Sequence, residues 1–300
     1  MGETGPLVSV VINCFNGERY LKKTIDSVIA QSYQKWEVIF WDNQSQDRSA
    51  EIFLSYQDKR LKYYYADQHE LLYKARNRAI EKISGELIAF LDADDFWEPN
   101  KLISQVCLFD NPKVGISCGN FWIKNESTGV VKLAIRKKIP SGMVLNKILA
   151  CYFVGMLTLV VRKTAIDKME PVFDPTFEII GDFDFVVKIA RNGWWIGSVQ
   201  EPIATYRVHN DSQTKKKNLL QELELKRWTA QKKEEGVHAW NGSYKYLDNN
   251  LNYVMAMNHL KSGNKIQALK IALKMPIGIY KIRIVAIIIA PTIVLSHFKS

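Results

Sequence analysis

Short apolar runs alternate with helical patterns through the N-terminal third of the chain, and this alternation limits the possible folds more than any other feature. The runs are rich in β-branched and aromatic residues, which favour strands buried on both faces of a sheet. They span Leu7 to Ile12, Trp36 to Trp41, Leu61 to Tyr65 and Leu87 to Leu91, and the predicted helices between them span Glu18 to Gln31, Ser49 to Leu54 and Leu71 to Ile83. This order predicts an α/β fold with a mixed, mainly parallel sheet flanked by helices.

Polar residues follow three of the predicted strands directly. Asn13 ends the first run, Asp42 ends the second, and Asp92 with Asp94 follows the fourth. The carboxyl ends of parallel strands meet at one edge of a sheet, where open α/β folds bind their ligands. Asp92 and Asp94 are two residues apart, so in an extended segment they project to the same side. Two convergent carboxylates suit a hard divalent cation that also holds substrate phosphates.

The acidic stretch Gly85 to Asp95 also has a purely structural interpretation. A solvated turn after a buried strand would carry the same carboxylates, with Asp95 as a helix cap before Trp97. Because polar residues end three strands and not one, we favour a ligand site over a turn.

Two common nucleotide-binding motifs are absent from the sequence. No Gly-x-Gly-x-x-Gly follows the first strand, and no Gly-x-x-x-x-Gly-Lys-Ser/Thr occurs, which disfavours a dinucleotide-binding domain and a P-loop. The run Asp42 to Asp47 lacks the central glycine and the final glutamate of a calcium loop.

The composition is that of a soluble globular protein, with 47% apolar and 24% charged residues among 300. A net charge of +10 indicates an anionic partner such as nucleic acid, membrane lipid or a phosphorylated substrate. We expect no nucleic-acid binding, because few aromatic residues stand among the basic residues of the C-terminal tail. That tail contains no Asp or Glu after Lys261; its cations are Lys261, Lys265, Lys270, Lys274, Lys281, Arg283 and Lys299.

Targeting signals and cysteine spacing favour a cytoplasmic protein. The N-terminus lacks the basic and apolar segments of a signal peptide, and Pro6 stands where myristoylation requires Ser or Thr. The cysteines show no zinc-site spacing, so we expect buried, reduced thiols at Cys14, Cys107, Cys118 and Cys151.

Four segments share the order and spacing of one enzyme family. They are Val8 to Gly17, Glu37 to Ser45, Ala75 to Asn77 and Gly85 to Asp95, within a region from Val8 to His209. In these segments the chain resembles family 2 glycosyltransferases with the GT-A (Rossmann-like) fold. The resemblance implies transfer, with inversion, of a sugar from a nucleotide-diphosphate donor to a hydroxyl. The expected donor is a UDP-sugar, and the expected acceptor is a glycan or lipid-linked molecule in cell-surface polysaccharide synthesis.

The resemblance also implies a metal site. Asp92, Ala93 and Asp94 match the family's Asp-x-Asp motif, which holds Mg²⁺ or Mn²⁺ against the donor diphosphate. The family places a His near the metal at the position of His209, so this residue is a candidate third ligand.

Other residues are implied to contact the nucleoside. Asp42 occupies the position that the family uses to hold the base or ribose, and Asn13 and Arg76 are candidate neighbouring contacts. The chain departs from the family at two strand ends. Asn13-Cys14 stands in place of Pro-Thr, and Asp42-Asn43-Gln44-Ser45 stands in place of Asp-Asp-Gly-Ser.

A second acid pair, Asp182 and Asp184, opens a predicted helix that runs to Ala190. The helix dipole favours acids there, so capping is one interpretation. The family has a Glu-Asp-x-Asp motif here whose first Asp is the general base, which implies Asp182 as the catalytic base. Gly181 replaces the glutamate.

The middle of the chain yields further predicted elements. They are a helix over Lys101 to Phe109, a strand pair over Val114 to Ile123, and strands over Gly155 to Val161 and Ile203 to His209.

We expect residues 1–218 to form the catalytic domain and residues 219–300 a helical appendage. Met255 to Pro276 resembles one tetratricopeptide-like helical pair. Ile284 to Leu295 would span roughly 18 Å as a helix, against about 30 Å of hydrocarbon, and should not cross a bilayer. It could be an interfacial anchor on the inner face of the plasma membrane, a helix packed on the catalytic domain, or a homodimer contact.

Two other function classes remain open from the sequence. A nucleotidyltransferase could use the same acids, although the basic glycine-rich loop of that class is missing. A nucleotide-sugar-binding protein with a degraded catalytic site would explain Gly181 and Asn43.

Overall fold

The computed structural model describes residues 5–209, 218–235 and 244–289. The chain divides into two compact units. The first unit contains residues 1–145 and 153–210, and the second contains residues 146–152 and 211–300.

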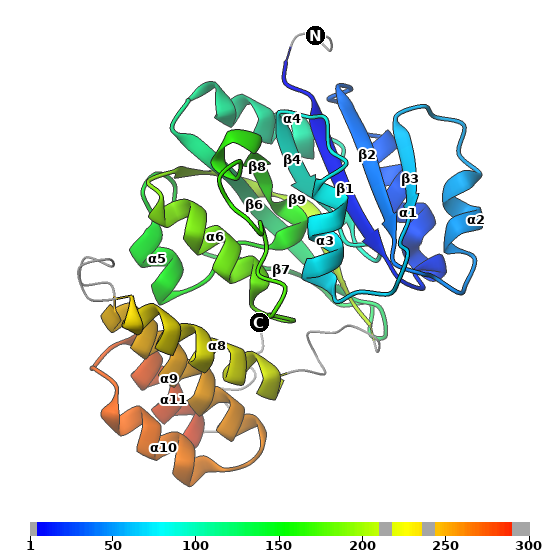
Figure 1. Cartoon of the computed structure of the whole chain (residues 1–300). Helices are drawn as coiled ribbons and strands as arrows, with labels where there is room; N and C mark the ends of the chain where they lie inside the picture. Colours follow the sequence, from blue (N-terminus) through cyan, green and yellow to red (C-terminus); the bar gives the residue numbers. More distant parts are fainter. Residues whose placement is uncertain (1–4, 210–217, 236–243, 290–300) are drawn as a thin grey trace. The chain divides into compact units, whose positions relative to one another are not determined.

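The first unit is built on one sheet. Four neighbouring strands are parallel: β1 (Val8–Cys14), β2 (Trp36–Asp42), β3 (Leu61–Tyr65) and β4 (Leu87–Phe90). The remaining strands are β5 (Phe96–Trp97), β6 (Val114–Asn125), β7 (Val131–Leu133), β8 (Val160–Arg162) and β9 (Trp195–Val208), and the order across the sheet is β3-β2-β1-β4-β8-β6-β9-β5. A second parallel pair joins β6 and β9. The predicted α/β architecture with a mixed, mainly parallel sheet is confirmed (Figure 1).

Helices cover both faces of this sheet. Alternate residues of β1, among them Val8 and Val10, pack against Leu21 and Ile25 of α1 (Glu18–Ile29) in one large core. This core also takes in side chains from α2 (Ser49–Leu54) and α4 (Lys101–Val106). On the other face, the ring of Phe90 meets the edge of Phe185 from α6 (Gly181–Arg191), and α3 (Leu72–Ile80) packs on β1 and β2. Both faces are therefore apolar, as the continuous apolar strands predict.

The strand order places a topological switch point at the carboxyl edge of the sheet, between β1 and β4. β1 lies between β2 and β4, so the chain runs from β1 to one side and returns to β4 on the other. The backbone ladder continues to the ends of these strands. The N–H of Leu91 donates to the carbonyl of Val11, and the N–H of Asn43 donates to that of Cys14. Such a switch point is where doubly wound sheets bind ligands.

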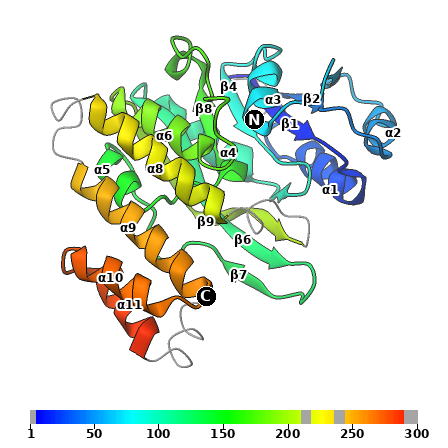
Figure 2. The same ribbon diagram turned by 60° about the horizontal axis from the view of Figure 1, so that its bottom comes forward.

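The predicted strand pair over Val114 to Ile123 is wrong, because β6 is one long strand across this range. Gly115 and Gly119 do not form turns. A Cβ on Gly115 would lie 2.7 Å from the side chain of Trp194, and one on Gly119 would lie 2.4 Å from that of Ile203. These glycines therefore allow close packing along a continuous strand, whose hairpin partner is β7 (Figure 2).

Two further predictions need correction. Much of Gly155 to Val161 is not a strand, because a 3-10 helix spans Met156–Thr158 and the Thr158 hydroxyl donates to the Gly155 carbonyl at 2.9 Å. The expectation of four buried thiols is half wrong, since Cys107 and Cys151 are exposed and Cys14 and Cys118 are buried. All four thiols are free, as predicted.

The second unit is helical. It contains α8 (Asn218–Glu234), α9 (Tyr244–Lys261), α10 (Lys265–Lys274), α11 (Ile279–Ile289) and most of α5 (Leu145–Ala150). The helical pair predicted over Met255 to Pro276 is confirmed in α9 and α10. Its small core residues, Ala256 on α9 with Ala268 and Ala272 on α10, allow the helices to approach closely. Residues 290–295 of the predicted apolar segment lie outside the described residues. Among the residues that are described, no helix is both long and apolar enough to cross a membrane.

Candidate active site

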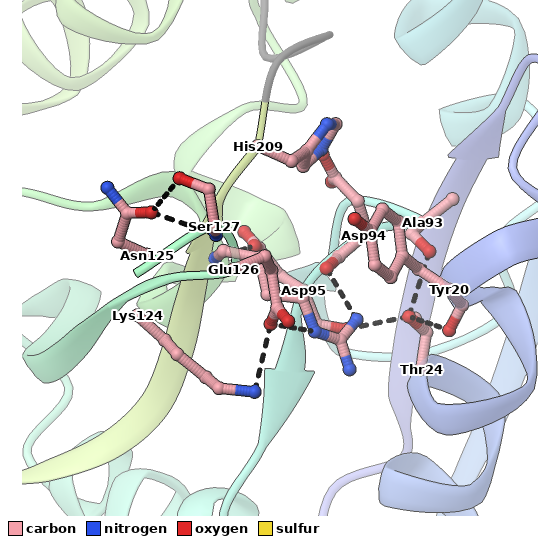
Figure 3. A network of polar contacts seen from close by, with 11 residues as sticks. Tyr20, Thr24, Ala93, Asp94, Asp95, Lys124, Asn125, Glu126, Ser127 and His209 are labelled. Atoms are coloured by element: carbon pink, nitrogen blue, oxygen red, sulfur yellow. Dashed lines mark hydrogen bonds and ion pairs between the residues drawn. The ribbon is translucent and has the colours of Figure 1, made fainter. Parts of the chain in front are cut away.

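The acidic turn after β4 meets the end of β9. The carboxylate Oδ2 of Asp94 lies 2.9 Å from the imidazole Nε2 of His209 (Figure 3). The neighbouring carboxylate of Asp92 instead accepts a hydrogen bond from the buried guanidinium of Arg76 at 2.5 Å. About a third of each carboxylate side chain is exposed, at 36% for Asp92 and 34% for Asp94. The predicted metal ligands Asp94 and His209 are thus in direct contact, and Asp92 is paired with a cation of the protein.

Negative charge is incompletely neutralised at this turn. Burial raises the pKa of Asp94 above its ordinary value, the charge of Asp92 raises it further, and the hydrogen bond to His209 opposes both. A bound cation would relieve the same repulsion, since an opposite charge favours the ionised form of a carboxyl group.

The donor set fits a divalent cation that is shared with a ligand. Mg²⁺ and Mn²⁺ accept carboxylate oxygen, and Mn²⁺ also accepts imidazole nitrogen. Within residues 5–209, 218–235 and 244–289, no group of three His, Cys, Asp or Glu side chains is arranged around one metal position. Mg²⁺ is commonly held by one or two carboxylates, with water and substrate phosphate completing its shell. Asp94 and His209 could hold a metal in this way, together with a phosphorylated ligand.

Arg207 ties the acidic turn to β9. Its backbone N–H donates to the carboxylate of Asp95 at 2.8 Å, and its Nη1 donates to the carbonyl oxygen of Asp94 at 2.6 Å. The guanidinium also lies 3.4 Å from the carboxylate of Glu126 and 5.0 Å from the ring centre of Tyr20. Sequence reasoning missed Arg207, although its position two residues before His209 in a strand puts both side chains on one side.

Asp95 is a structural member of the turn. It is only 1% exposed, and burial, followed by the charges of Asp94 and Asp92, raises its pKa well above the ordinary range. The interpretation of Asp95 as a helix cap is wrong, because β5 begins at the next residue and the carboxylate accepts from the N–H of Arg207.

Helix α1 holds the same turn through a side-chain hydroxyl. The hydroxyl of Thr24 lies 2.6 Å from the carbonyl oxygen of Asp95 and 2.9 Å from that of Ala93. Figure 3 shows Thr24 and Tyr20 beside the turn, on the side of α1. The side chain of Ala93 is buried and faces this packing.

Asp42 lies at the predicted strand end, but its side chain is fully buried. Its Oδ1 accepts from the N–H of Ser45 at 2.7 Å, and its Oδ2 accepts from the hydroxyl of Tyr63 at 2.8 Å. Burial, and next the hydrogen bond to Asp42, raise the pKa of Tyr63. In this structure Asp42 holds the loop after β2 and the ring of Tyr63 in place.

The two departures after Asp42 have local structural explanations. The amide of Asn43 forms two hydrogen bonds with the backbone of Glu70, at 2.7 and 3.1 Å, and fixes the loop after β3. Gln44 has φ +68°, the left-handed conformation for which glycine is preferred. Its side chain donates to the carbonyl of Asp67 at 2.7 Å. The family's glycine position therefore keeps its backbone conformation here, and the side chain gains a partner.

Asn13 retains unused hydrogen-bonding capacity. Both polar atoms of its side chain are buried and have no partner among the described residues. Burial raises the pKa of the adjacent Cys14 thiol to about 11, which favours its protonated form at neutral pH. Beside Asn43, the exposed ring of Phe15 packs on that of His69 with centres 4.3 Å apart. No pattern in the sequence indicates this pairing.

Asp182 and Asp184 lie in the first turn of α6 but have different surroundings. The N-cap residue of α6, Ile180, has no side-chain capping hydrogen bond. The carboxylate of Asp182 instead accepts a hydrogen bond from the backbone N–H of Phe183 at 2.8 Å, so this acid does bind an N–H group of the first helical turn. Asp184 is buried and lies 2.6 Å from the ammonium of Lys188 one turn later. Asp182 is half-buried, and its charge acts on Arg76.

The environment of Arg76 connects the two acid pairs. Burial by itself lowers the pKa of this guanidinium, but the charge of Asp92, then Tyr73 and Asp182, raises it above its ordinary value. Tyr73 also explains Gly181. A Cβ at Gly181 would lie 2.5 Å from the Tyr73 ring, so a larger residue does not fit at this position.

Sequence comparisons identify similar proteins. The profile described as Glycosyl transferase family 2 matches residues 9–165. The UDP-Glc:alpha-D-GlcNAc-diphosphoundecaprenol beta-1,3-glucosyltransferase WfgD of Escherichia coli is 33% identical over 161 residues, which cover 54% of this chain and 62% of that protein. The uncharacterized glycosyltransferase RT0329 of Rickettsia typhi is 30% identical over 274 residues, covering 86% of this chain and 82% of that protein.

Solved structures share the fold at low sequence identity. The Staphylococcus aureus protein TarS (residues 1–349), crystallised with UDP-GlcNAc, aligns with a TM-score of 0.60 and 17% identity, over 94% of this chain and 71% of that one. The mannosyltransferase PcManGT of Pyrobaculum calidifontis, in complex with GDP-Man and Mn²⁺, aligns with a TM-score of 0.66 and 15% identity, over 98% of this chain and 81% of that one.

Proposed function

Because the chain belongs to glycosyl transferase family 2, we propose that it is a metal-dependent, inverting enzyme that transfers a sugar from a nucleotide-diphosphate donor to a hydroxyl. The proposal is carried by one observation, the contact of Asp94 with His209 at the carboxyl edge of the sheet. The donor we propose is a UDP-sugar, as used by the E. coli relative and bound by TarS. The acceptor we propose is a glycan or lipid-linked molecule of cell-surface polysaccharide synthesis.

In the proposed site, Asp94 and His209 hold Mg²⁺ or Mn²⁺, with Asp92 beside them. When bound, the metal neutralises the negative charge that develops on the leaving nucleoside diphosphate. The ion pair with Arg76, at 2.5 Å, fixes the orientation of the Asp92 carboxylate.

Residues at the ends of β1 and β2 receive the nucleoside. The amide of Asn13 has a donor and an acceptor available, which supports its assignment as a contact. Asp42 shapes the loop through Ser45 and Tyr63. Direct contact of Asp42 with the base or ribose requires the exchange of one of these hydrogen bonds.

Asp182 acts as the general base. Its carboxylate takes the proton of the acceptor hydroxyl while the acceptor oxygen attacks the anomeric carbon. The bond from that carbon to the diphosphate breaks on the opposite face, so the configuration inverts. The exposed part of Asp182 and its electrostatic influence on Arg76 support this assignment.

We assign catalysis to residues 1–218 and treat residues 219–300 as an appendage. We further propose that the protein works in the cytoplasm, at the inner face of the plasma membrane. The alternative of a binding protein with a degraded site loses its motivation. Gly181 and Asn43 each have a packing reason in this structure that does not require loss of activity.

A binding screen tests the donor assignment. Nucleotide sugars are titrated into the protein with Mn²⁺, with Mg²⁺ and with a chelator. We expect one uridine-based donor to bind only with the divalent ion, and we expect Asp94→Asn to weaken this binding. Glu86→Gln is the matched control, because Glu86 is an exposed acid at the opposite end of β4. Metal-independent binding of every donor, or equal loss in both variants, would contradict the proposal.

A further inference from the structure

Helix α10 carries an exposed apolar stripe. Ile266, Leu269 and Leu273 are exposed by 73%, 37% and 64%. At 3.6 residues per turn they fall within an arc of about 60° around the helix axis. They therefore form one continuous face.

This stripe is distinct from the face by which α10 packs in its own unit. Ala268, Ile271 and Ala272 lie on the other side of the helix and are buried in the core with α9 and α11. A surface helix normally needs only one apolar face to fold. Among the described residues of the second unit, the second apolar face of α10 is not part of the core.

Lysines border the stripe on both sides. On the same helical projection, Lys265 lies on one side of the three apolar residues and Lys270 on the other. Both lysines are exposed. At the end of the helix, the ammonium of Lys281 donates to the carbonyls of Leu273 and Met275 at 3.1 and 3.0 Å. A third cation therefore sits at the C-terminal end of the stripe.

The segment that carries the stripe has charged residues of one sign. The sequence from Lys261 to Ser300 contains no Asp or Glu, so no acid of this segment offsets the lysines. An apolar stripe bordered by lysines is the pattern of helices that lie in the interface of a bilayer, where acyl chains meet the stripe and anionic headgroups meet the lysines.

We propose that the α10 surface, made of Ile266, Leu269 and Leu273 with Lys265, Lys270 and Lys281, docks on an anionic lipid bilayer. The sequence analysis considered Ile284 to Leu295 as one candidate anchor, of which residues 290–295 lie outside the described residues and Ile289 is exposed. Ile284 and Ile287 are buried in the second unit. Docking itself does not depend on the proposed function. Only its role does, because docking would bring the enzyme to a lipid-linked acceptor.

Vesicle co-sedimentation of the full chain tests this docking. The probes are phosphatidylcholine vesicles with and without phosphatidylglycerol. We expect binding only to the anionic vesicles, weakened by salt and reduced about fivefold for each of Lys265→Gln and Lys270→Gln. The double variant Leu269→Gln/Leu273→Gln should bind at least tenfold more weakly.

Leu54→Gln provides the matched control, because Leu54 is a 58% exposed leucine on α2 of the first unit. It should bind vesicles as the wild type does. Sugar transfer to a soluble acceptor should be unchanged in all these variants, so failure of docking and failure of the proposed function give different results. Equal vesicle binding by the stripe variant and the wild type would overturn the proposal. So would an absence of vesicle binding, or self-association that the stripe variant abolishes.

Discussion

The carboxylate of Asp94 and the imidazole of His209 lie 2.9 Å apart, although 115 positions separate them in the chain. The contact joins the turn after β4 to the end of β9, so two segments far apart in the chain supply the pair of side chains that we propose as metal ligands. The buried Arg207, two residues before His209, holds the backbone of the same turn.

Removing either member of this pair should weaken the donor site. We expect Asp94→Asn and His209→Ala each to reduce kcat/KM on the order of 10²-fold or more, because each removes a group that stabilises charge at the diphosphate. Donor titrations with and without Mn²⁺ should show the loss only in the presence of the metal. If a variant keeps wild-type donor affinity and activity, the assignment of the substituted residue to the donor site is wrong.

Arg207 should act as a positioning residue. Arg207→Met removes the hydrogen bond to the Asp94 carbonyl and the ion pair with Glu126, and we expect a loss of about 2–4 kcal/mol in urea unfolding. Metal-dependent donor binding should fall as well, because the turn is no longer held. Arg207→Lys should not restore it, since one ammonium cannot reproduce the planar guanidinium. Lys124→Met is the control, because Lys124 also contacts Glu126, at 3.0 Å; the same loss there would argue against a specific role for Arg207.

Gly181 should resist substitution even by alanine. A helix position normally gains about 0.5–1 kcal/mol from Gly→Ala. Here the added methyl would meet the buried ring of Tyr73 at 2.5 Å, so we expect Gly181→Ala to destabilise by about 1–3 kcal/mol. Thermal unfolding should show this loss in the wild-type background and less of it with Tyr73→Leu. Gly278→Ala, where nothing lies within 4 Å, should be nearly neutral. Stabilisation by Gly181→Ala would show that the Tyr73 ring moves to make room for the methyl group, and would contradict this prediction.

Lys101 should make stability depend on alkaline pH. The side chain is fully buried over the ring of Trp97, its Nζ has no hydrogen-bond partner among the described residues, and burial holds its pKa well below 10.5. Between the folded pKa and 10.5 the unfolded chain carries a proton that the folded chain lacks. Stability therefore rises with pH through this window.

Replacing this lysine by a neutral residue should remove that dependence. We expect Lys101→Met to be more stable than the wild type at pH 7 by about 1–3 kcal/mol. The difference should shrink as the pH approaches 10.5. Urea unfolding over a pH series measures both quantities. Lys59→Met, at an exposed position, should stay within about 0.5 kcal/mol of the wild type at every pH. A flat difference for Lys101→Met would mean that the buried amine is charged in the folded protein.

The sequence predicted the parallel half of the sheet because each of its strands has a local signature. Apolar runs ending at Asn13, Asp42 and Asp92 were enough to place three polar groups at one edge. A local sequence pattern does not identify the residues from distant segments that contact it. The burial of Asp42 under Tyr63 and the pairing of Asp92 with Arg76 could therefore not be read from spacing.

Glycine and apolar residues misled the sequence-based analysis for the same reason. The range Val114 to Ile123 was interpreted as a strand pair, whereas it lies within one strand in which Gly119 makes room for Ile203 from another strand. For Ile284 the sequence left open a membrane anchor, a helix packed on the catalytic domain and a dimer contact; the residue is buried in the second unit, and Leu273 on the preceding helix is exposed. In each case the sequence did not indicate which residues of other elements pack against the segment.

The most direct test of Asp182 as the general base of sugar transfer compares the wild type with Asp182→Asn in one assay. Release of nucleoside diphosphate and binding of the donor are measured together, with donor, divalent metal and acceptor added singly and in combination. The account predicts release by the wild type only when all three are present. Asp182→Asn should bind the donor with unchanged affinity and release product on the order of 10²–10⁴-fold more slowly. Full transfer by Asp182→Asn, or release by the wild type without acceptor at the same rate, would contradict it.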